Sequence, residues 1–337
     1  MKQEDRDRRE RSVFPIPLPA DKRSVFALAV LSVIVSLFVL RGLEKDDASA
    51  RKSTRLSAKP SKALTDSLST ALKSSAVDFE SLVVESIHRR GYVTATVHVA
   101  LLDRRRENDA GAFSDGRNPA TNMYWGALFG METHFANAAG WRRAYTDNGD
   151  GERILRRVVF HQRVSPTPHW RERGVGRAFD LYVLANAWPY SRIVEAMGRP
   201  IREAVCGEAN TIDVDGSTLV FGGDSALVGY VGQNHMLEGY WDPFAGLEGC
   251  APTQQVGIFY ICSRSAVVLH APIVERGLYS VLFTRSTVTP EAYLVDGMFK
   301  ALLSGELGDG FISRAASEYS RYQKSVSFPR AKSMLIR

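Results

Sequence analysis

The feature that most constrains this chain is one uncharged apolar run near its start, Ser24–Leu40. The run contains neither a charged residue nor a proline, and charged residues flank it on both sides. Its length is at the short end of the roughly 17–25 residues that an α-helix needs to cross a bilayer. We therefore expect a transmembrane or signal-anchor helix over 24–41, followed by the globular part of the chain.

Two other interpretations of this run are open. A buried core helix is disfavoured because both flanks are charged and poor in apolar residues. A cleaved signal peptide requires a small-residue site, and Ala48-Ser-Ala50 is of that type. That site lies well beyond the apolar run and past Glu44, Asp46 and Asp47, so we favour an uncleaved anchor.

The orientation of this single-pass anchor is nearly balanced. Lys and Arg residues lie close to both ends of the run, and only these residues count in the positive-inside rule. A short, charged N-terminal tail ordinarily stays inside, which places the globular domain on the extracytoplasmic side. The basic residues that follow the run argue for the opposite orientation. We expect the extracytoplasmic side.

Composition divides the 337 residues into tails and one folded domain. Residues 1–23 are polar, charged and interrupted by prolines, which is typical of a disordered tail. Residues 42–76 are rich in Ser, Lys and Ala and are expected to form a flexible tether. The pattern predicts an α/β domain over 77–323 and a basic tail over 324–337.

The charge balance bears on the partners of the chain. It has 43 Lys and Arg residues against 37 Asp and Glu residues, and much of the excess lies in the tails. Basic tails next to a membrane helix are attracted by anionic lipid headgroups. Nucleic-acid surfaces typically show a basic stripe with interleaved aromatic residues, and the sequence has no such stripe. We expect membrane lipid as a partner and no nucleic acid, while a peptide or protein partner is implied by the family resemblance given below.

The three cysteines, Cys206, Cys250 and Cys262, are too few and odd in number for a disulfide framework. In an exported domain Cys206 and Cys250 could pair and leave Cys262 free, whereas all three would be thiols in a reducing compartment. His161 and His169 lack metal-ligand spacing with any cysteine, so no metal is expected. The glycine patterns do not match a phosphate-binding loop, so no cofactor is expected.

Apolar runs alternate with helical patterns from Phe79 onward, which predicts an α/β fold. Helices are expected over 79–88, 123–135, 190–205 and 290–303, and strands over 92–102, 157–161, 179–185, 225–232, 256–262 and 279–284. Several of these strands are apolar on both faces. That pattern is typical of a mostly parallel sheet covered by helices on both sides, with a Rossmann-like or caspase-like three-layer arrangement.

In such sheets the ligand lies outside the carboxyl ends of the strands. Two successive runs, Tyr230–His235 and Phe259–Arg264, end there in polar groups. If their strands are parallel neighbours, these ends lie about 5 Å apart. A nucleophilic cysteine needs its thiolate form, and an imidazole can supply the base. We therefore predict Cys262 and His235 as a catalytic pair.

Other polar or aromatic residues at this edge are candidates for substrate binding. They are Asp103, Asn122, Tyr124, Trp125, Gln233, Asn234, Ser263, Arg264 and Arg285.

Each candidate also has a structural interpretation. A cysteine on an apolar strand is most often an inert packing residue, and a histidine at a strand end is often a surface turn residue. Asn122 could cap a helix, with Tyr124 and Trp125 in the core. Asp103 could belong to a solvated turn.

The layout of the two polar strand ends resembles the caspase-like cysteine peptidases, the group of caspases, gingipains and separases. In that group a His-Gly pair follows one core strand, and the nucleophilic Cys follows the next. The resemblance covers 92–303 as strand order but only the two short runs as motif. It implies a cysteine endopeptidase in which Cys262 forms an acyl-enzyme and His235 protonates the leaving amine. Backbone N–H groups near Gly232 would hold the oxyanion.

The chain is also similar to a family of uncharacterised bacterial proteins. That family has an Asn-x-Tyr-Trp-Gly element, present here as Asn122–Gly126, and a Cys-x-Ser/Arg strand end, present as Cys262–Arg264. The helix start Pro290–Tyr293 also fits. The family's Tyr-Val-Gly-His-Asn-Gly strand end differs here, because Gln233 stands at the His position and His235 at the following Gly position.

This departure favours an alternative to the peptidase. Glutamine cannot act as a general base, and the separation of His235 from Cys262 is shorter than the roughly 50 residues noted for caspases. The alternative is an inactive relative, a membrane-tethered binding or scaffold domain that uses the same cleft. A Rossmann-like nucleotide-binding module is disfavoured by the missing glycine fingerprint.

Overall fold

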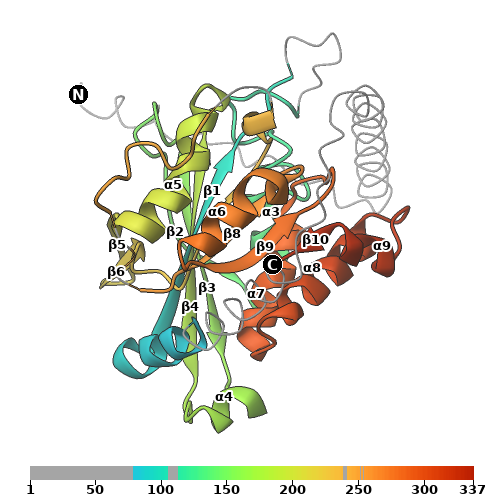
Figure 1. Cartoon of the computed structure of the whole chain (residues 1–337). Coiled ribbons are helices and arrows are strands. Elements are labelled where there is room, and N and C mark those ends of the chain that lie inside the picture. The colour runs from blue at the N-terminus through green and yellow to red at the C-terminus, as the bar shows by residue number, and fades with distance from the viewer. Residues whose placement is uncertain (1–78, 105–112, 238–240, 251, 253) are drawn as a thin grey trace, which may run out of the picture.

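The computed structural model describes residues 79–104, 113–237, 241–250, 252 and 254–337. An eight-stranded sheet runs through this part of the chain in the order β10-β9-β8-β7-β1-β4-β3-β2, with helices on both faces (Figure 1). The central strands β9, β8, β7, β1 and β4 are parallel, whereas β10, β3 and β2 pair in antiparallel fashion. The predicted α/β class with a mostly parallel sheet is confirmed.

The predicted membrane helix over 24–41 lies outside the described residues, as do the tail 1–23 and the tether 42–76. Among the described helices, none combines the length and the apolar character that crossing a bilayer requires.

The strands of the large sheet and of a separate hairpin have the following bounds. They are β1 (Tyr92–Ala100), β2 (Arg142–Asp147), β3 (Arg156–Val164), β4 (Phe179–Trp188), β7 (Leu227–Val231), β8 (Gly257–Ile261), β9 (Tyr279–Thr284) and β10 (Leu335–Ile336), with the hairpin β5 (Ala209–Val214) and β6 (Ser217–Gly222).

Helical residues 79–90 precede β1. The later α-helices are α3 (Met131–Asn137), α4 (Pro168–Glu172), α5 (Ile193–Cys206), α6 (Ala271–Glu275), α7 (Ala292–Ser304), α8 (Asp309–Tyr322) and α9 (Phe328–Ser333). Three short helical turns are η1 (Tyr190–Arg192), η2 (His235–Leu237) and η3 (Ala266–His270).

All six predicted strands are present, but the helix expected over 123–135 is wrong in its first half. Residues 123–130 form turns, and only α3 is helical. Gly126 and Gly130 explain the difference, because a Cβ on Gly126 would lie 2.2 Å from the Ala120 carbonyl oxygen and one on Gly130 would lie 2.5 Å from the backbone of Trp125. These close backbone approaches require glycine and a tight turn in place of a continuous helix.

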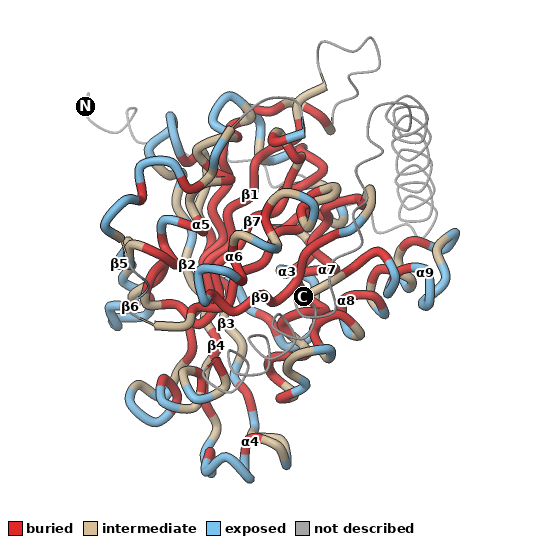
Figure 2. The backbone as a smooth tube through the Cα atoms, in the orientation of Figure 1, coloured by how far each residue is buried: buried red, intermediate tan, exposed pale blue. Residues whose placement is uncertain are grey.

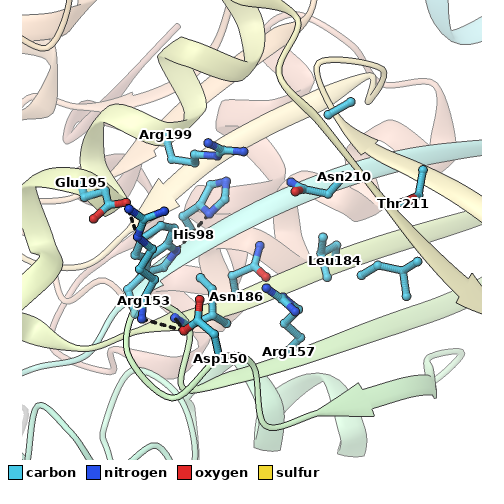
Figure 3. A pocket seen from close by; sticks show the side chains of 14 residues that line it. His98, Asp150, Arg153, Arg157, Leu184, Asn186, Glu195, Arg199, Asn210 and Thr211 are labelled. Carbon is cyan, nitrogen blue, oxygen red and sulfur yellow. Dashed lines mark hydrogen bonds and ion pairs between the residues drawn. The ribbon is translucent and has the colours of Figure 1, made fainter.

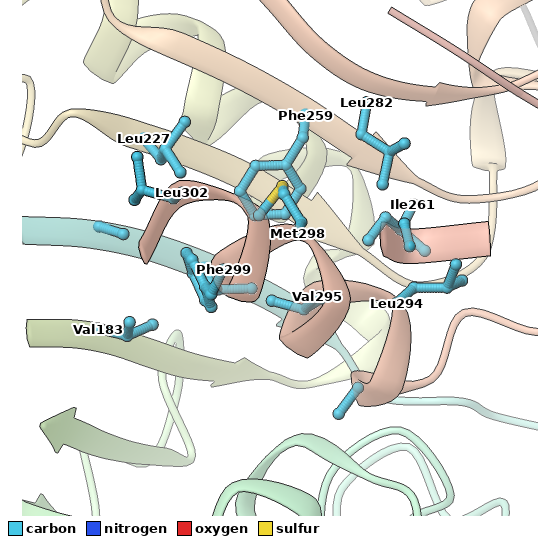
Figure 4. Close-up of a cluster of buried hydrophobic side chains, with 14 of the residues drawn as sticks. Val183, Leu227, Phe259, Ile261, Leu282, Leu294, Val295, Met298, Phe299 and Leu302 are labelled. Atoms are coloured by element: carbon cyan, nitrogen blue, oxygen red, sulfur yellow. The ribbon is translucent and has the colours of Figure 1, made fainter. Parts of the chain in front are cut away.

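One face of the sheet is covered by α3, α7, α8 and helix 79–90. Along β1, the side chains of Val93, Ala95, Val97 and Val99 lie in the core cluster of this face, as period-two alternation requires. Helix α7 places its apolar side chains on the strands in Figure 4. Figure 2 shows that the sheet is buried along most of its length, whereas the helices keep an exposed side.

The opposite face is covered by α5 and α6 over β7, β8 and β9. A disulfide joins Cys206, at the end of α5, to Cys250 in the segment before β8. The sequence predicted this pair for an exported domain. Cys262 is the free cysteine among the three.

The basic residues at the end of the chain belong to the fold. Residues 324–337, which the sequence placed in a tail, contain α9 and β10, and β10 pairs with β9. The last residue, Arg337, is bonded to the domain, because its backbone oxygen accepts a hydrogen bond of 2.8 Å from His270 Nε2.

Candidate functional site

The structure brings the two polar strand ends together. Strands β7 and β8 are parallel neighbours, with Tyr230 opposite Tyr260 and Val231 opposite Ile261. The loop that follows β7 is bonded to the end of β8, since Asn234 Nδ2 donates a hydrogen bond of 2.7 Å to the Ser263 carbonyl oxygen. The predicted adjacency of the two runs is therefore present.

Cys262 is completely buried at the end of β8, within the apolar cluster under α5 and α6. Burial raises the pKa of its thiol far above the usual value, and a hydrogen bond with Ser265 opposes this effect only in part. A nucleophilic cysteine requires the opposite, a lowered pKa and access to solvent. As the fold stands, Cys262 is held as a neutral thiol.

The backbone around Cys262 is fixed by buried hydroxyl groups. Ser265 Oγ donates a hydrogen bond of 2.8 Å to the Tyr260 carbonyl oxygen, and Thr284 Oγ1 donates to that of Cys262. Arg264, which lies between Cys262 and Ser265, adopts a left-handed conformation with φ of 56°, which is uncommon for a residue other than glycine. The turn after β8 is thus closely determined by its neighbours.

Gly232 occupies the turn after β7, where its own strand leaves no room for a side chain. Its φ is 155°, and a Cβ there would lie 2.5 Å from Tyr230 Oη. That hydroxyl donates a hydrogen bond of 2.9 Å to the Gln233 carbonyl oxygen. The space above Gly232 is therefore filled by the hydroxyl of Tyr230.

Gln233, Asn234 and His235 occupy three different environments. Gln233 is half-buried, and among the described residues its Oε1 has no hydrogen-bond partner although it is shielded from solvent. Asn234 is buried, and its Oδ1 accepts a hydrogen bond of 3.1 Å from the Met236 backbone N–H. His235 is half-buried at the first position of η2.

Asn122 is a structural residue in this fold. Its Oδ1 accepts hydrogen bonds of 3.1 Å from the N–H groups of Leu102 and Tyr124, and its Nδ2 donates to the carbonyl oxygens of Leu102 and Asp115. All four positions of the amide are used, so the side chain joins the end of β1 to the turns over 113–130. Trp125 is fully buried.

The remaining candidates have separate environments. Asp103 packs against Gly116, Ser263 Oγ accepts a hydrogen bond of 3.4 Å from the Val288 N–H, and Arg264 is half-buried. Arg285 is exposed just after β9, where its backbone N–H donates to the Met334 carbonyl oxygen.

Glu291 is a buried carboxyl group at this edge that the sequence did not single out. It is the N-cap residue of α7 and is 2% exposed. Burial raises its pKa to about 7, although a hydrogen bond with Tyr293 acts in the opposite direction. Burial also raises the pKa of the Tyr124 hydroxyl, although the nearby charge of Arg104 acts in the opposite direction. Its place before α7 was readable from Pro290, but its burial was not.

A row of polar residues across the sheet was also missed. Paired positions on adjacent strands carry, in order, Tyr260, Tyr230, His98, Asn186, Arg157 and Asp147. The available signal was a polar residue that interrupts an otherwise apolar strand, as His98 does in β1 and Asn186 in β4.

Comparisons of the chain with family models, with curated proteins and with solved structures found no match.

Proposed function

We propose that this chain is a membrane-tethered, non-catalytic binding domain that takes a peptide or protein ligand at the carboxyl edge of the sheet. The observation that carries the proposal is the state of Cys262, whose thiol is fully buried and has a raised pKa. Gln233 stands where the resembling bacterial family has histidine, and an amide cannot take a proton from the thiol. The edge keeps the layout of a peptidase site without an activated nucleophile.

The disulfide supports an extracytoplasmic position for the domain. Disulfides persist in oxidising compartments and are rare in the reducing cytosol. The pairing of Cys206 with Cys250 therefore agrees with the orientation in which the short N-terminal tail stays inside.

A cysteine endopeptidase is the second candidate. It is favoured by the parallel pairing of β7 with β8, which places the Gln233–His235 segment beside the strand that ends at Cys262. In that case His235 would have to serve as the base, and the thiol would have to become accessible when substrate binds.

Alkylation of the full-length protein in detergent separates the two candidates. With the disulfide intact, Cys262 carries the free thiol of the three cysteines, so labelling by iodoacetamide reports on that thiol alone. We expect slow labelling in the folded protein and fast labelling in urea, because burial suppresses the thiolate. Cys262→Ala provides the blank. Fast, selective labelling by an electrophilic peptide at neutral pH, lost in His235→Ala, would establish the peptidase.

The binding function is tested with a displayed peptide library selected on the full-length protein. Peptides that bind the carboxyl edge should lose affinity for Arg285→Ala, because Arg285 is exposed at that edge. Arg171→Ala is the matched control, since Arg171 is also exposed but lies on α4, at the opposite end of the sheet in Figure 1. Equal affinity for both variants would refute binding at this edge. Cleavage of the selected peptides by the wild-type protein would refute the non-catalytic assignment.

A further inference from the structure

A polar cavity of about 460 Å³ lies on the face of the sheet that carries α5. Its floor includes His98, Asn186 and Arg157, three consecutive members of the polar row, on β1, β4 and β3. In Figure 3, α5 contributes Glu195 and Arg199 on one side, and β5 contributes Asn210 and Thr211 on the other. This cavity is distinct from the strand ends around Cys262.

Asn186 is the strongest indication that the cavity holds a ligand. The residue is 4% exposed, and Figure 3 shows its side chain directed into the space beside Arg157. Its amide has no hydrogen-bond partner anywhere in the described part of the chain. Buried side-chain amides are nearly always bonded, because leaving one unpaired costs about 1–3 kcal/mol. A donor and an acceptor at the floor are therefore available to a bound molecule.

The guanidinium groups of Arg157 and Arg153, at the same cavity, also have unused hydrogen-bond donors. Arg157 lies 3.7 Å from Asp147, and Arg153 Nε lies 3.5 Å from Glu195. These are long ion pairs, and among the described residues neither guanidinium group donates a hydrogen bond. A guanidinium group has five N–H donors in a fork that matches carboxylate and phosphate oxygens.

Two of the neighbouring carboxylates, in contrast, already accept hydrogen bonds, and the third, Glu195, is shared between ion pairs of 3.5 Å with Arg153 and Arg192. Asp150 Oδ1 accepts from the backbone N–H groups of Ile154, Arg153 and Glu152, which lower the pKa of this carboxyl group. Asp147 accepts from Tyr145 Oη at 2.7 Å. The cavity therefore has unused N–H donors on its arginine and asparagine side chains. A ligand rich in acceptor oxygens would complement these donors.

A series of buried hydrogen bonds positions Arg199, the third arginine at the cavity. Trp188 Nε1 donates to His98 Nδ1 at 3.1 Å, which fixes the proton of the imidazole on Nε2. His98 Nε2 then donates to the fully buried carboxylate of Glu203, which also accepts from Arg199 Nε at 3.2 Å. These hydrogen bonds hold Arg199 at the cavity wall before a ligand binds.

We propose that this cavity is a binding site for a small anionic ligand that carries a carboxylate or phosphate group. Arg157 and Arg153 bind the anionic oxygens, and the amide of Asn186 bonds a neighbouring polar group of the ligand. Neither Cys262 nor the loop that follows β7 lines this cavity, and the proposal does not depend on peptide binding at the carboxyl edge.

Calorimetric titration of the full-length protein in detergent tests this site with two probes, inorganic phosphate and succinate, at ionic strength matched with chloride. We expect saturable binding of at least one probe, and the stronger of the two identifies the anion class. Arg157→Gln should weaken binding by about tenfold or more, because it removes charge-assisted hydrogen bonds. Asn186→Leu, which is similar in shape, should weaken it less.

Arg163→Gln is the matched control, because Arg163 lies on the same strand β3, is more exposed, and pairs with Asp180 outside the cavity. It should leave binding unchanged. If Arg157→Gln fails to fold, Arg157→Lys keeps the charge and should still weaken binding by losing the fork geometry. Absence of saturable binding for both probes would overturn the proposal, as would equal affinity in the Arg157 and Arg163 variants.

Discussion

At the scale of single residues, the polar groups at the carboxyl edge differ in how many of their hydrogen-bonding positions have partners in the fold. The amide of Asn122 uses all its hydrogen-bonding positions, whereas Glu291 Oε2 is buried without a partner among the described residues. A buried carboxyl group in this state is stabilised as the neutral acid, because desolvation disfavours its charge. Glu291 should therefore make the stability of the domain depend on pH.

The sign of that dependence follows from the raised pKa. The unfolded chain ionises Glu291 near the model-peptide value of 4.5, whereas the folded protein keeps its proton to about pH 7. The free energy of unfolding should fall as pH rises between these values, by at most roughly 3 kcal/mol. We expect Glu291→Gln to remove this part of the pH dependence, measured by urea unfolding at about pH 5 and about pH 8.

Glu275→Gln is the control for this experiment, because Glu275 is exposed on α6 and its removal should leave the pH dependence as in the wild type. The same loss of stability with rising pH in Glu291→Gln as in the wild type would show that Glu291 does not titrate in this range.

At the scale of elements, the central strands were predictable because their signal is local. Runs such as β8 and β9 are apolar on both faces, and a short run of that kind suits a strand covered on both sides. The outer elements carry a weaker signal. Strand β2 and hairpin strand β5 are largely exposed, so their side chains lack the apolar pattern that would have identified them.

For the candidate site, the adjacency of the two strand ends was predictable from the sequence. Adjacent parallel strands place Cys262 beside the loop that follows β7, which the order of the runs already indicated. The burial of this site was not predictable. The hydroxyl of Tyr230 lies over Gly232, and hydrogen bonds from Ser265 and Thr284 fix the turn that follows β8. Such contacts join residues through space, and the sequence pattern does not encode their geometry.

The disulfide is an element-level restraint that can be measured. Cys206 and Cys250 are separated by 44 residues and tie the end of α5 to the segment before β8. Loop closure in the unfolded chain predicts a stabilisation of up to about 4 kcal/mol. We expect Cys206→Ser combined with Cys250→Ser to lower the free energy of unfolding by roughly 2–4 kcal/mol in urea titrations.

Reduction provides the internal control for that measurement. Dithiothreitol should destabilise the wild-type protein by a similar amount and leave the double variant unchanged. If the reductant has no effect on the wild-type protein, the two cysteines are not paired in solution.

At the scale of the whole molecule, the uncharged run Ser24–Leu40 should determine where the chain is found. We expect the full-length protein to sediment with membranes and to resist extraction by alkaline carbonate, because an apolar helix that crosses the bilayer is not released by loss of charge contacts. Immunoblotting of the membrane and soluble fractions measures this. Replacing Val33 and Val35 with lysine should release the protein, since charged residues in the bilayer centre are strongly disfavoured.

As a control, lysine at Ser12 and Val13, in the polar segment before the run, should leave the protein in the membrane fraction. Full-length protein of unchanged mass in the soluble fraction would rule out the anchor.

The two outer strands of the sheet also bear on how the protein behaves at high concentration. An unpaired, flat and apolar strand is a template for pairing with another chain. Strand β2 carries charged residues along one edge, and the two residues of β10 cover β9, whose six residues are all buried. A chain shortened by proteolysis before Leu335 would expose an apolar edge to other molecules, so the last strand protects this protein from aggregation by strand addition.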